Sequence, residues 1–151
     1  RGPQVMKGYL KHPTATAETK TEDGWLRTGD LAVIDEDGFM FIRDRLKELI
    51  KFKGFQVAPA EIEEVLITHE DIIDAAVVGK EDEEAGELPI AFVVKREGAS
   101  VDGAMVTAYL EGCLAKYKIP AEIRFVDQVP KSASGKILRR FLRDELRAEA
   151  G

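Results

Sequence analysis

The spacing of apolar residues divides the chain into an irregular start and a periodic remainder. Residues 1–30 hold many turn-forming residues and little periodicity. Two apolar runs, at 31–34 and 39–42, flank a short acidic segment and predict a β-hairpin with a tight turn. Residues 46–52 alternate apolar and charged side chains, which predicts a strand that is interrupted at Gly54.

The rest of the chain combines helical and strand-like spacing. A helix is expected to begin at Pro59, although Ala58 before it is a poor N-cap. Apolar residues from Val106 to Tyr117 recur at helical spacing and predict an amphipathic helix that Pro120 ends. Together the elements predict an α+β fold, a small sheet with helices packed on it. The remaining predicted elements are strands at 72–78, 90–94 and 123–126, a solvated acidic loop at 81–87, and an Arg-rich helix around 138–146.

Composition and charge exclude several classes of protein. The 151 residues include 22 Lys+Arg and 28 Asp+Glu, a formal net charge of -6, so no nucleic-acid partner is expected. No apolar run approaches the roughly 20 residues that cross a bilayer, so no membrane span is expected. The single Cys113 and the distant His12 and His69 indicate no metal site. The start at Arg1, with no signal peptide, leads us to expect a piece of a longer, cytoplasmic protein.

A basic stretch within the acidic middle of the chain is the first candidate site. Alternation on the predicted strand would place four mutually repelling cations on one face, namely Arg45, Lys47, Lys51 and Lys53. One interpretation is a phosphate-binding face beside Gly54, where a glycine would let a ligand approach the backbone. The other, which the spacing alone favours, is a solvated edge strand that its lysines protect from aggregation.

Two further segments could contact a nucleotide. Residues 130–136 partly match a phosphate-binding loop, but Pro130 replaces its first glycine and Ile137 its Ser or Thr. Lys136 could still deliver a point charge to a phosphate, or it could belong to a flexible surface loop. Asp30, which ends a turn, could accept two ribose hydroxyls or have a structural role only.

Four segments carry a joint resemblance to a known family. They are Arg-Thr-Gly-Asp at 27–30, Asp-Arg-Leu-Lys-Glu-Leu-Ile-Lys at 44–51, Lys-Gly-Phe-Gln-Val-Ala-Pro-Ala-Glu at 53–61 and Pro-Lys-Ser-Ala-Ser-Gly-Lys at 130–136. In this order they resemble the C-terminal part of the adenylate-forming superfamily, which includes acyl- and aryl-CoA ligases, firefly luciferase and peptide-synthetase adenylation domains. The second and third segments are most similar to 4-coumarate–CoA ligase and luciferase. They lack the Gly-Arg start and the Arg-Gly typical of peptide synthetases, which disfavours that branch.

The resemblance implies an enzyme with two half-reactions. A carboxylate attacks the α-phosphate of ATP, giving an acyl-adenylate and pyrophosphate; a small C-terminal domain then rotates, and the thiol of CoA displaces AMP. Residues 1–43 would be the end of a large N-terminal AMP-binding domain, and 44–151 the C-terminal lid domain. Asp44 would be the hinge. Lys136 would be the catalytic residue that stabilises charge on the α-phosphate and carboxylate oxygens.

The resemblance also implies the remaining ligand contacts. The nucleotide would be bound by Asp30, Arg45, Lys47, Lys51 and Gln56, and CoA by Lys53 and Gly54. The implied ligands are ATP, with Mg²⁺ held by the N-terminal domain, CoA and a carboxylic acid. That domain would be the partner of this chain, which we expect to be inactive alone. The alternatives are a luciferase-like or peptide-synthetase adenylation enzyme, or a non-enzymatic module that binds a phosphate ligand.

Overall fold

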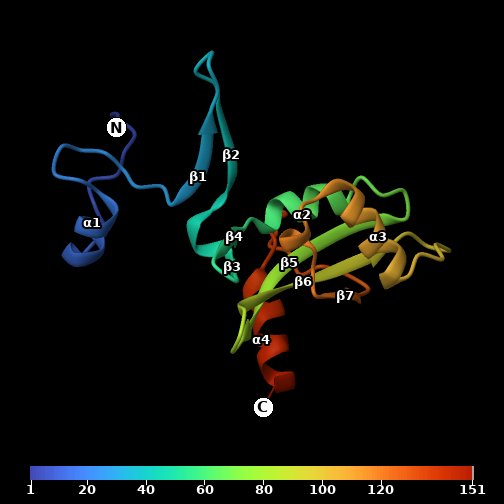
Figure 1. Ribbon diagram of the computed structural model, residues 1–151. Helices are drawn as coiled ribbons and strands as arrows, with labels where there is room; N and C mark the ends of the chain where they lie inside the picture. The colour runs from blue at the N-terminus through green and yellow to red at the C-terminus, as the bar shows by residue number, and fades with distance from the viewer. Residues whose placement is uncertain (151) are drawn as a thin grey trace. The chain divides into compact units, whose positions relative to one another are not determined.

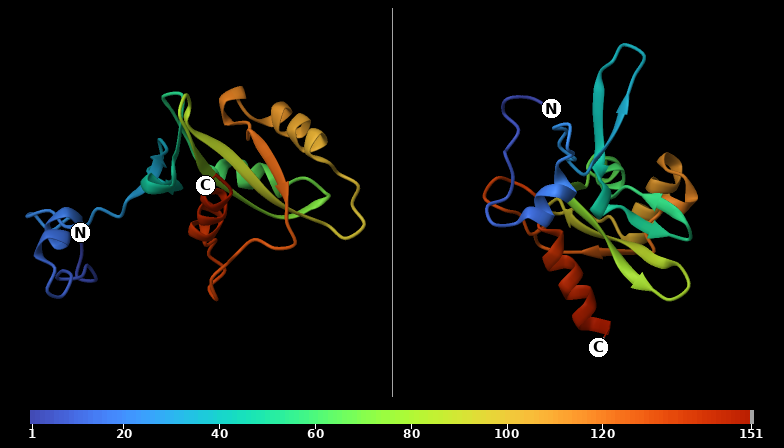
Figure 2. Two further views of the ribbon diagram at one scale, coloured as in Figure 1. Left: turned by 90° about the horizontal axis from the view of Figure 1, so that it is seen from below. Right: turned by 90° about the vertical axis from the view of Figure 1, so that its left-hand side faces the viewer.

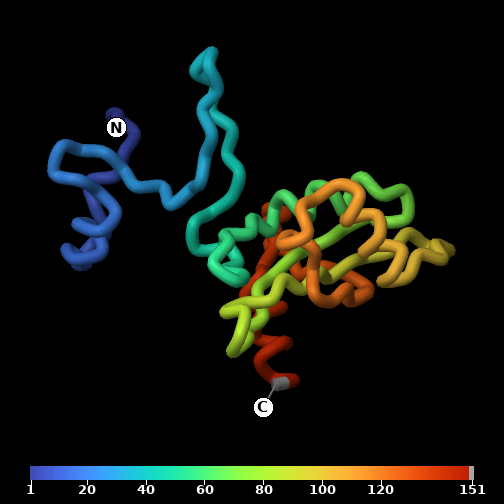
Figure 3. Tube along the Cα trace, viewed as in Figure 1, coloured from blue at the N-terminus to red at the C-terminus, as the bar shows by residue number. Residues whose placement is uncertain are grey.

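A computed structural model of the protein describes residues 1–150. The chain forms two compact units, which are Arg1–Asp30 and the described residues from Leu31 onward (Figures 1 and 3). Each unit is considered by itself. The first holds a helix that the sequence did not predict, α1 (Pro13–Thr19), which begins at a proline whose missing N–H has no role in the first turn.

The predicted β-hairpin is confirmed. Strand β1 (Asp30–Ile34) pairs with β2 (Met40–Arg45). Asp35 closes the turn, because its Oδ1 accepts the N–H of Phe39 at 2.8 Å and its carbonyl accepts the N–H of Gly38 at 3.1 Å. Most apolar side chains of the hairpin are exposed: Val33, Ile34, Phe39, Met40, Phe41 and Ile42.

The strand predicted over 46–52 is wrong in its first half. A 3₁₀ helix, η1 (Leu46–Glu48), precedes a short strand, β3 (Ile50–Phe52). Leu49 and Ile50 are both buried, at 8% and 1% exposure, although consecutive residues of a strand point to opposite faces. The turn of η1 just before Leu49 lets both side chains reach the core. The four cations of this segment therefore do not share one strand face.

Strand β3 turns directly into β4 (Phe55–Val57). Phe52 pairs with Phe55, which leaves Lys53 and Gly54 as a two-residue loop with φ of 47° and 82°. Two consecutive positive φ values are typical of a type I′ hairpin turn, whose second position favours glycine. Gly54 thus has a conformational role in the turn that does not depend on any ligand.

A five-stranded sheet with helices on both faces forms the core of the second unit (Figures 1 and 2). Its strand order is β4-β3-β6-β5, and β7 pairs with β6 in parallel. Alternate residues of the central hairpin face opposite sides, so Val77 packs with residues of α2 and α3 and Val78 with residues of α4. The predicted α+β fold is confirmed. The bounds are β5 (Ile72–Asp82), β6 (Gly86–Lys95), β7 (Glu122–Phe125), α2 (Pro59–Leu66), α3 (Gly103–Cys113) and α4 (Arg139–Ala150).

The acidic loop predicted at 81–87 is mostly strand. Strands β5 and β6 extend past the predicted apolar runs, and Glu81 pairs with Glu87 in the same hairpin. The Glu87 Oε2 accepts the backbone N–H of Lys51 at 2.7 Å. This carboxylate is therefore not a solvated loop acid; it helps to hold β3 against β6.

The predicted amphipathic helix ends earlier than expected. Helix α3 stops at Cys113, where Leu114 takes an extended backbone conformation. Tyr117 lies on a separate 3₁₀ turn, η2 (Lys116–Lys118), but it still packs against the core and stacks on Phe55 with 4.4 Å between the ring centroids. Core packing thus keeps the apolar side chain in place without a continuous helix.

Replacing Gly54 by alanine should lower the free energy of unfolding by about 1 kcal/mol, the cost of a left-handed backbone conformation for an L-residue. A Cβ at Gly54 would meet no atom within 4 Å, so no clash should add to this cost. Urea unfolding of the variant measures the loss. Gly112→Ala is the matched control, because Gly112 is helical and its Cβ would also meet no atom. An equal loss in both variants would contradict the explanation from backbone strain.

Candidate functional site

A groove of about 520 Å³ lies between η1 and the start of α4, and we call it the Lys136 groove. Four predicted site residues from distant parts of the sequence line it together: Asp44, Arg45, Lys47 and Lys136. The other lining residues are Glu48, Ile137, Leu138, Arg139, Arg140 and Arg143. The fold thus brings the predicted hinge residue and the predicted catalytic lysine to one groove.

Lys136 is presented by a hydrogen-bonded turn. Lys131 and Ile137 form a backbone bridge, and the N–H of Ser132 donates to the carbonyl of Lys136 at 2.9 Å. The N–H of Lys136 lies 3.2 Å from Ser132 Oγ, and Gly135 completes the turn with a φ of 80°. The side chain of Lys136 is exposed and takes part in no ion pair among the described residues. Its ammonium group is therefore available to a ligand.

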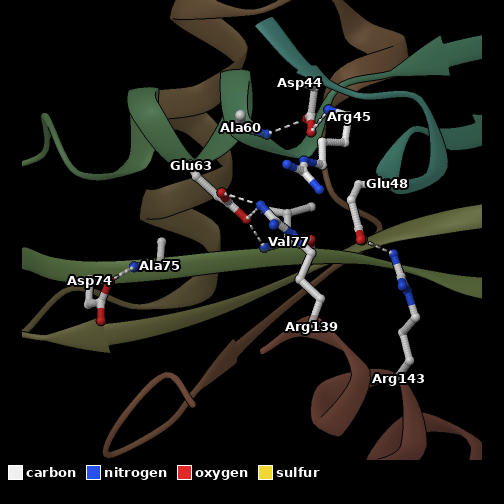
Figure 4. Close-up of polar contacts among 10 residues, drawn as sticks. All are labelled: Asp44, Arg45, Glu48, Ala60, Glu63, Asp74, Ala75, Val77, Arg139 and Arg143. Carbon is white, nitrogen blue, oxygen red and sulfur yellow. Dashed lines mark hydrogen bonds and ion pairs between the residues drawn. The ribbon is translucent and has the colours of Figure 1, made fainter. Parts of the chain in front are cut away.

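Asp44 is buried at the end of β2, at 8% exposure. Its Oδ1 accepts the N–H of Arg45 at 2.6 Å and its Oδ2 accepts the N–H of Ala60 at 3.1 Å (Figure 4). Ala60 is in the first turn of α2, where Pro59 has no N–H and Ala58 has no side-chain acceptor. Asp44 therefore caps α2 from another element, and its charge suits the positive end of the helix.

Glu63 on α2 and Arg139 at the start of α4 form an ion pair, with side chains 12% and 15% exposed (Figure 4). Arg139 Nη2 lies 2.8 Å from Oε1 and 2.6 Å from Oε2 of Glu63. The N–H of Val77 on β5 donates to the same Oε1 at 2.7 Å, and Arg139 Nε donates to the Val77 carbonyl at 3.3 Å. Burial raises the pKa of Glu63 above its ordinary value of 4.5; Arg139 and the Val77 N–H oppose the rise, and the charge of Asp44 adds to it.

A second ion pair joins η1 to α4. Arg143 Nη2 lies 2.6 Å from Glu48 Oε2 (Figure 4). Carboxylates thus compensate two of the arginines that line the groove. Three other lining cations are exposed and form no ion pair among the described residues, namely Lys47, Lys136 and Arg140. The resulting positive charge suits a polyanion such as a nucleotide phosphate.

The remaining predicted site residues of the second unit lie on the β3–β4 hairpin. Lys51 and Gln56 pair opposite each other, while Lys53 and Gly54 form the turn. All four are exposed, and none lines the Lys136 groove. Gln56 lines a separate groove of about 400 Å³. The structure therefore divides the predicted ligand contacts into two sets.

Asp30 belongs to the first unit. It is half-buried, and its backbone N–H lies 3.3 Å from Thr28 Oγ1. Its predicted contact with ribose stays a prediction. Among residues 1–150, no group of three or more His, Cys, Asp or Glu side chains could hold a metal ion. No helix in this described part is long and apolar enough to cross a membrane.

The Glu63–Arg139 pair is a feature that the sequence did not predict. The two residues are 76 positions apart, so no local pattern connects them. Glu63 directly follows the buried Ile62 on α2. An ionisable residue next to a buried position of a helix was the one indication in the sequence that Glu63 could itself be partly buried. That signal does not identify the partner.

The fold and the groove define a class of protein, a small α+β domain that carries a basic groove beside a buried, helix-capping carboxylate. Residues 61–136 match the model of the family described as AMP-binding enzyme C-terminal domain. The chain belongs to this family. The resemblance expected from the four sequence segments is thereby confirmed.

Its sequence relatives are CoA ligases. The chain is 55% identical over 148 residues to 4-coumarate–CoA ligase 1 of Solanum tuberosum and 51% identical over 142 residues to peroxisomal OPC-8:0-CoA ligase 1 of Arabidopsis thaliana. These alignments cover 98% and 94% of this chain, but 27% and 26% of the relatives. The chain thus spans about a quarter of the length of the curated relatives it matches.

Solved structures share the fold. ATP-bound MatB from Rhodopseudomonas palustris is 39% identical with a TM-score of 0.91, over 96% of this chain and 29% of that chain. The o-succinylbenzoate CoA synthetase MenE from Bacillus subtilis, in complex with its acyl-adenylate intermediate, is 40% identical with a TM-score of 0.86, over 95% of this chain and 29% of that chain. The roles of individual site residues stay predictions.

Arg139→Gln should destabilise the chain more at pH 7.5 than at pH 4.5. Burial already raises the pKa of Glu63, and loss of Arg139 raises it further, so ionising Glu63 costs folding free energy as the pH rises above 4.5. Breaking a largely buried pair should cost roughly 3 kcal/mol at pH 7.5. Urea unfolding at both pH values measures the difference from the wild-type chain.

The matched control is the double variant Glu63→Gln/Arg139→Gln, which has no carboxyl group at this position. Its destabilisation should depend much less on pH. The same pH dependence in the single and double variants would contradict the assignment to Glu63.

Proposed function

We propose that this chain is the C-terminal part of an ATP-dependent carboxylic acid–CoA ligase. The observation that carries the proposal is the Lys136 groove, which brings Asp44, Arg45 and Lys47 together with an exposed lysine that forms no ion pair within the described part of the chain. Membership of the AMP-binding enzyme C-terminal domain family supports it, as does the high identity to enzymes named CoA ligases. The whole reaction would need a large N-terminal domain, for which the greater length of the relatives is the support.

In the first half-reaction, Lys136 would act on the α-phosphate of ATP. Its ammonium group would stabilise the charge that develops on the phosphate and carboxylate oxygens as the acyl-adenylate forms. Arg45 and Lys47, on the same groove, would add positive charge toward the nucleotide. Asp30 would bind the ribose hydroxyls. We propose that the Mg²⁺ that accompanies ATP is held by the large domain.

In the second half-reaction, the domain would rotate at Asp44 and present the β3–β4 hairpin. The division of the predicted contacts into two sets supports a mechanism with two faces. Lys51 and Gln56, paired across the hairpin, would approach AMP together, joined by Lys47. Lys53 and Gly54, at the turn, would line the path of CoA. The domain boundary would then fall at 43/44, as the resemblance implies.

The acid substrate is proposed only as a class. The relatives named for 4-coumarate and OPC-8:0 support an aryl or fatty carboxylic acid. A luciferase-like or peptide-synthetase enzyme would share the adenylation step but differ in the second half-reaction. A non-enzymatic phosphate-binding module would perform neither.

Lys136→Ala in the full-length protein should lower adenylation by about 100- to 1000-fold, because it removes a positioned charge from the transition state. Substrate-dependent exchange of pyrophosphate into ATP, with a panel of aryl and fatty acids, measures this step. Thioester formation from a supplied acyl-adenylate should be retained. Lys116→Ala, at an exposed lysine on η2, is the control and should change neither step. Equal loss of both steps in Lys136→Ala would refute the role.

The 151-residue chain alone should form no acyl-CoA from ATP, CoA and a carboxylic acid, because we propose that the large domain holds the acyl pocket and a phosphate-binding loop for ATP. Mass spectrometry of the products tests this. Adding the separately produced large domain is the matched positive control. Thioester formation by the chain alone would overturn the proposed division of the active site.

A further inference from the structure

We propose that Glu63 and Arg139 are positioning residues for Lys136. Their ion pair would fix the place from which Lys136 reaches the reacting phosphate, without touching the substrate itself. This inference rests on the role proposed for Lys136. It gives a function to the Glu63–Arg139 ion pair, which takes no part in the two half-reactions proposed above.

The pair fixes the C-terminal end of the loop that carries Lys136. Arg139 begins α4 three residues after Lys136, and its guanidinium contacts both carboxylate oxygens of Glu63. Both side chains also bond to one residue of the buried strand β5, because Val77 donates its N–H to Glu63 and accepts the Nε–H of Arg139. Figure 4 shows the three residues joined by these contacts. The start of α4 is thus held to both α2 and β5.

The other end of the loop is held to the same strand. Lys131 Nζ lies 2.6 Å from Oδ2 of Asp74, three positions before Val77 on β5. The N–H of Leu138 donates to the carbonyl of Pro130 at 2.8 Å and closes the base of the loop. The loop therefore cannot move along β5 without breaking an ion pair. The Glu63–Arg139 pair is the more buried of the two, with exposures of 12% and 15% against 38% and 27% for Lys131 and Asp74.

Stability alone does not account for an ion pair at this position. Burying two charges has a desolvation cost that well-packed apolar residues avoid. Helix α4 is already attached by Leu142 and Leu146 in the core, and by Arg143 to Glu48. Arg139 donates from Nη2 to the Glu63 carboxylate and from Nε to the Val77 carbonyl, so directional hydrogen bonds orient its guanidinium, which apolar packing does not do. Lys136 needs such precision, because its own side chain has no ion-pair partner among the described residues to fix it.

The test compares two ion pairs that helix α4 forms, one at each of its ends, in the full-length protein. Glu63→Gln removes the negative charge that pairs with Arg139 at the start of α4, whereas Glu149→Gln removes the ion pair between Glu149 and Arg124 at the far end of the same helix. Glu63→Gln should lower the kcat of adenylation by about 10- to 100-fold, as expected for a misplacement near 1 Å. It should leave thioester formation from a supplied acyl-adenylate unchanged. Glu149→Gln should change neither rate, and Arg139→Lys should lie between Glu63→Gln and the wild-type protein.

Two further measurements separate positioning from folding. In a Lys136→Ala background, Glu63→Gln should cause no additional loss of adenylation, because it acts through Lys136. In hydrogen exchange, Glu63→Gln but not Glu149→Gln should speed the exchange of amides at 132–138, a readout that needs no activity.

Specific outcomes would overturn the inference. They are equal loss of both half-reactions, an additional loss in the Lys136→Ala background, or unchanged exchange at 132–138. Failure of the proposed function would look different. Lys136→Ala would then show no selective loss, and the exchange experiment alone would decide whether Glu63 holds the loop.

Discussion

The contact on which the site depends is the ion pair between Glu63 and Arg139. It joins α2 and α4, which pack on opposite faces of the sheet, and both of its side chains also bond to Val77 of the strand β5. Two mostly buried charges are stable only when their hydrogen-bonding capacity is used. Here the backbone of Val77 supplies the additional donor and acceptor. The pair therefore helps to fix the start of α4 and the end of the loop before it, in addition to the core contacts of Leu142 and Leu146.

This constraint also shapes the electrostatics of the groove. The Lys136 groove is rich in arginine, yet Arg139 and Arg143 are each compensated by a carboxylate that lies on another element. Lys47, Lys136 and Arg140 also line the groove and form no ion pair with the described residues, so they contribute uncompensated positive charge. Arginines that are paired with carboxylates thus lie side by side with the cations for which we propose a role in ligand binding. The whole chain has a formal net charge of -6, yet it can in this way present a locally positive groove.

The sequence predicted the helices and strands whose apolar residues recur at a regular spacing. Its predictions failed where contacts between distant residues determine the local structure. Helix α2 was predicted correctly because Pro59 and the apolar face after it are local signals. Lys136 could be proposed as a site residue because its motif is local, and its role stays a prediction. The strand predicted over 46–52 was half wrong, since the burial of both Leu49 and Ile50 requires a turn that alternation cannot reveal. The cap of α2 was missed for a related reason. Ala58 is a poor cap by its residue type, and only the fold shows that Asp44, sixteen positions before Ala60, accepts the N–H of Ala60 in its place.

The same cap limits how the proposed rotation at Asp44 could occur. The carboxylate of Asp44 accepts the N–H groups of Arg45 and Ala60, which both follow it in the chain. Rotation about the N–Cα bond of Asp44 would move its side chain together with these residues, so both hydrogen bonds would survive. Rotation about the Cα–C bond would instead carry Ala60 away from the carboxylate and leave a buried anion and a helix N–H without partners, which is costly. The N–Cα bond is therefore the lower-energy axis if this residue is the hinge, and the buried carboxylate would then keep α2, Glu63 and the Lys136 loop moving as one body.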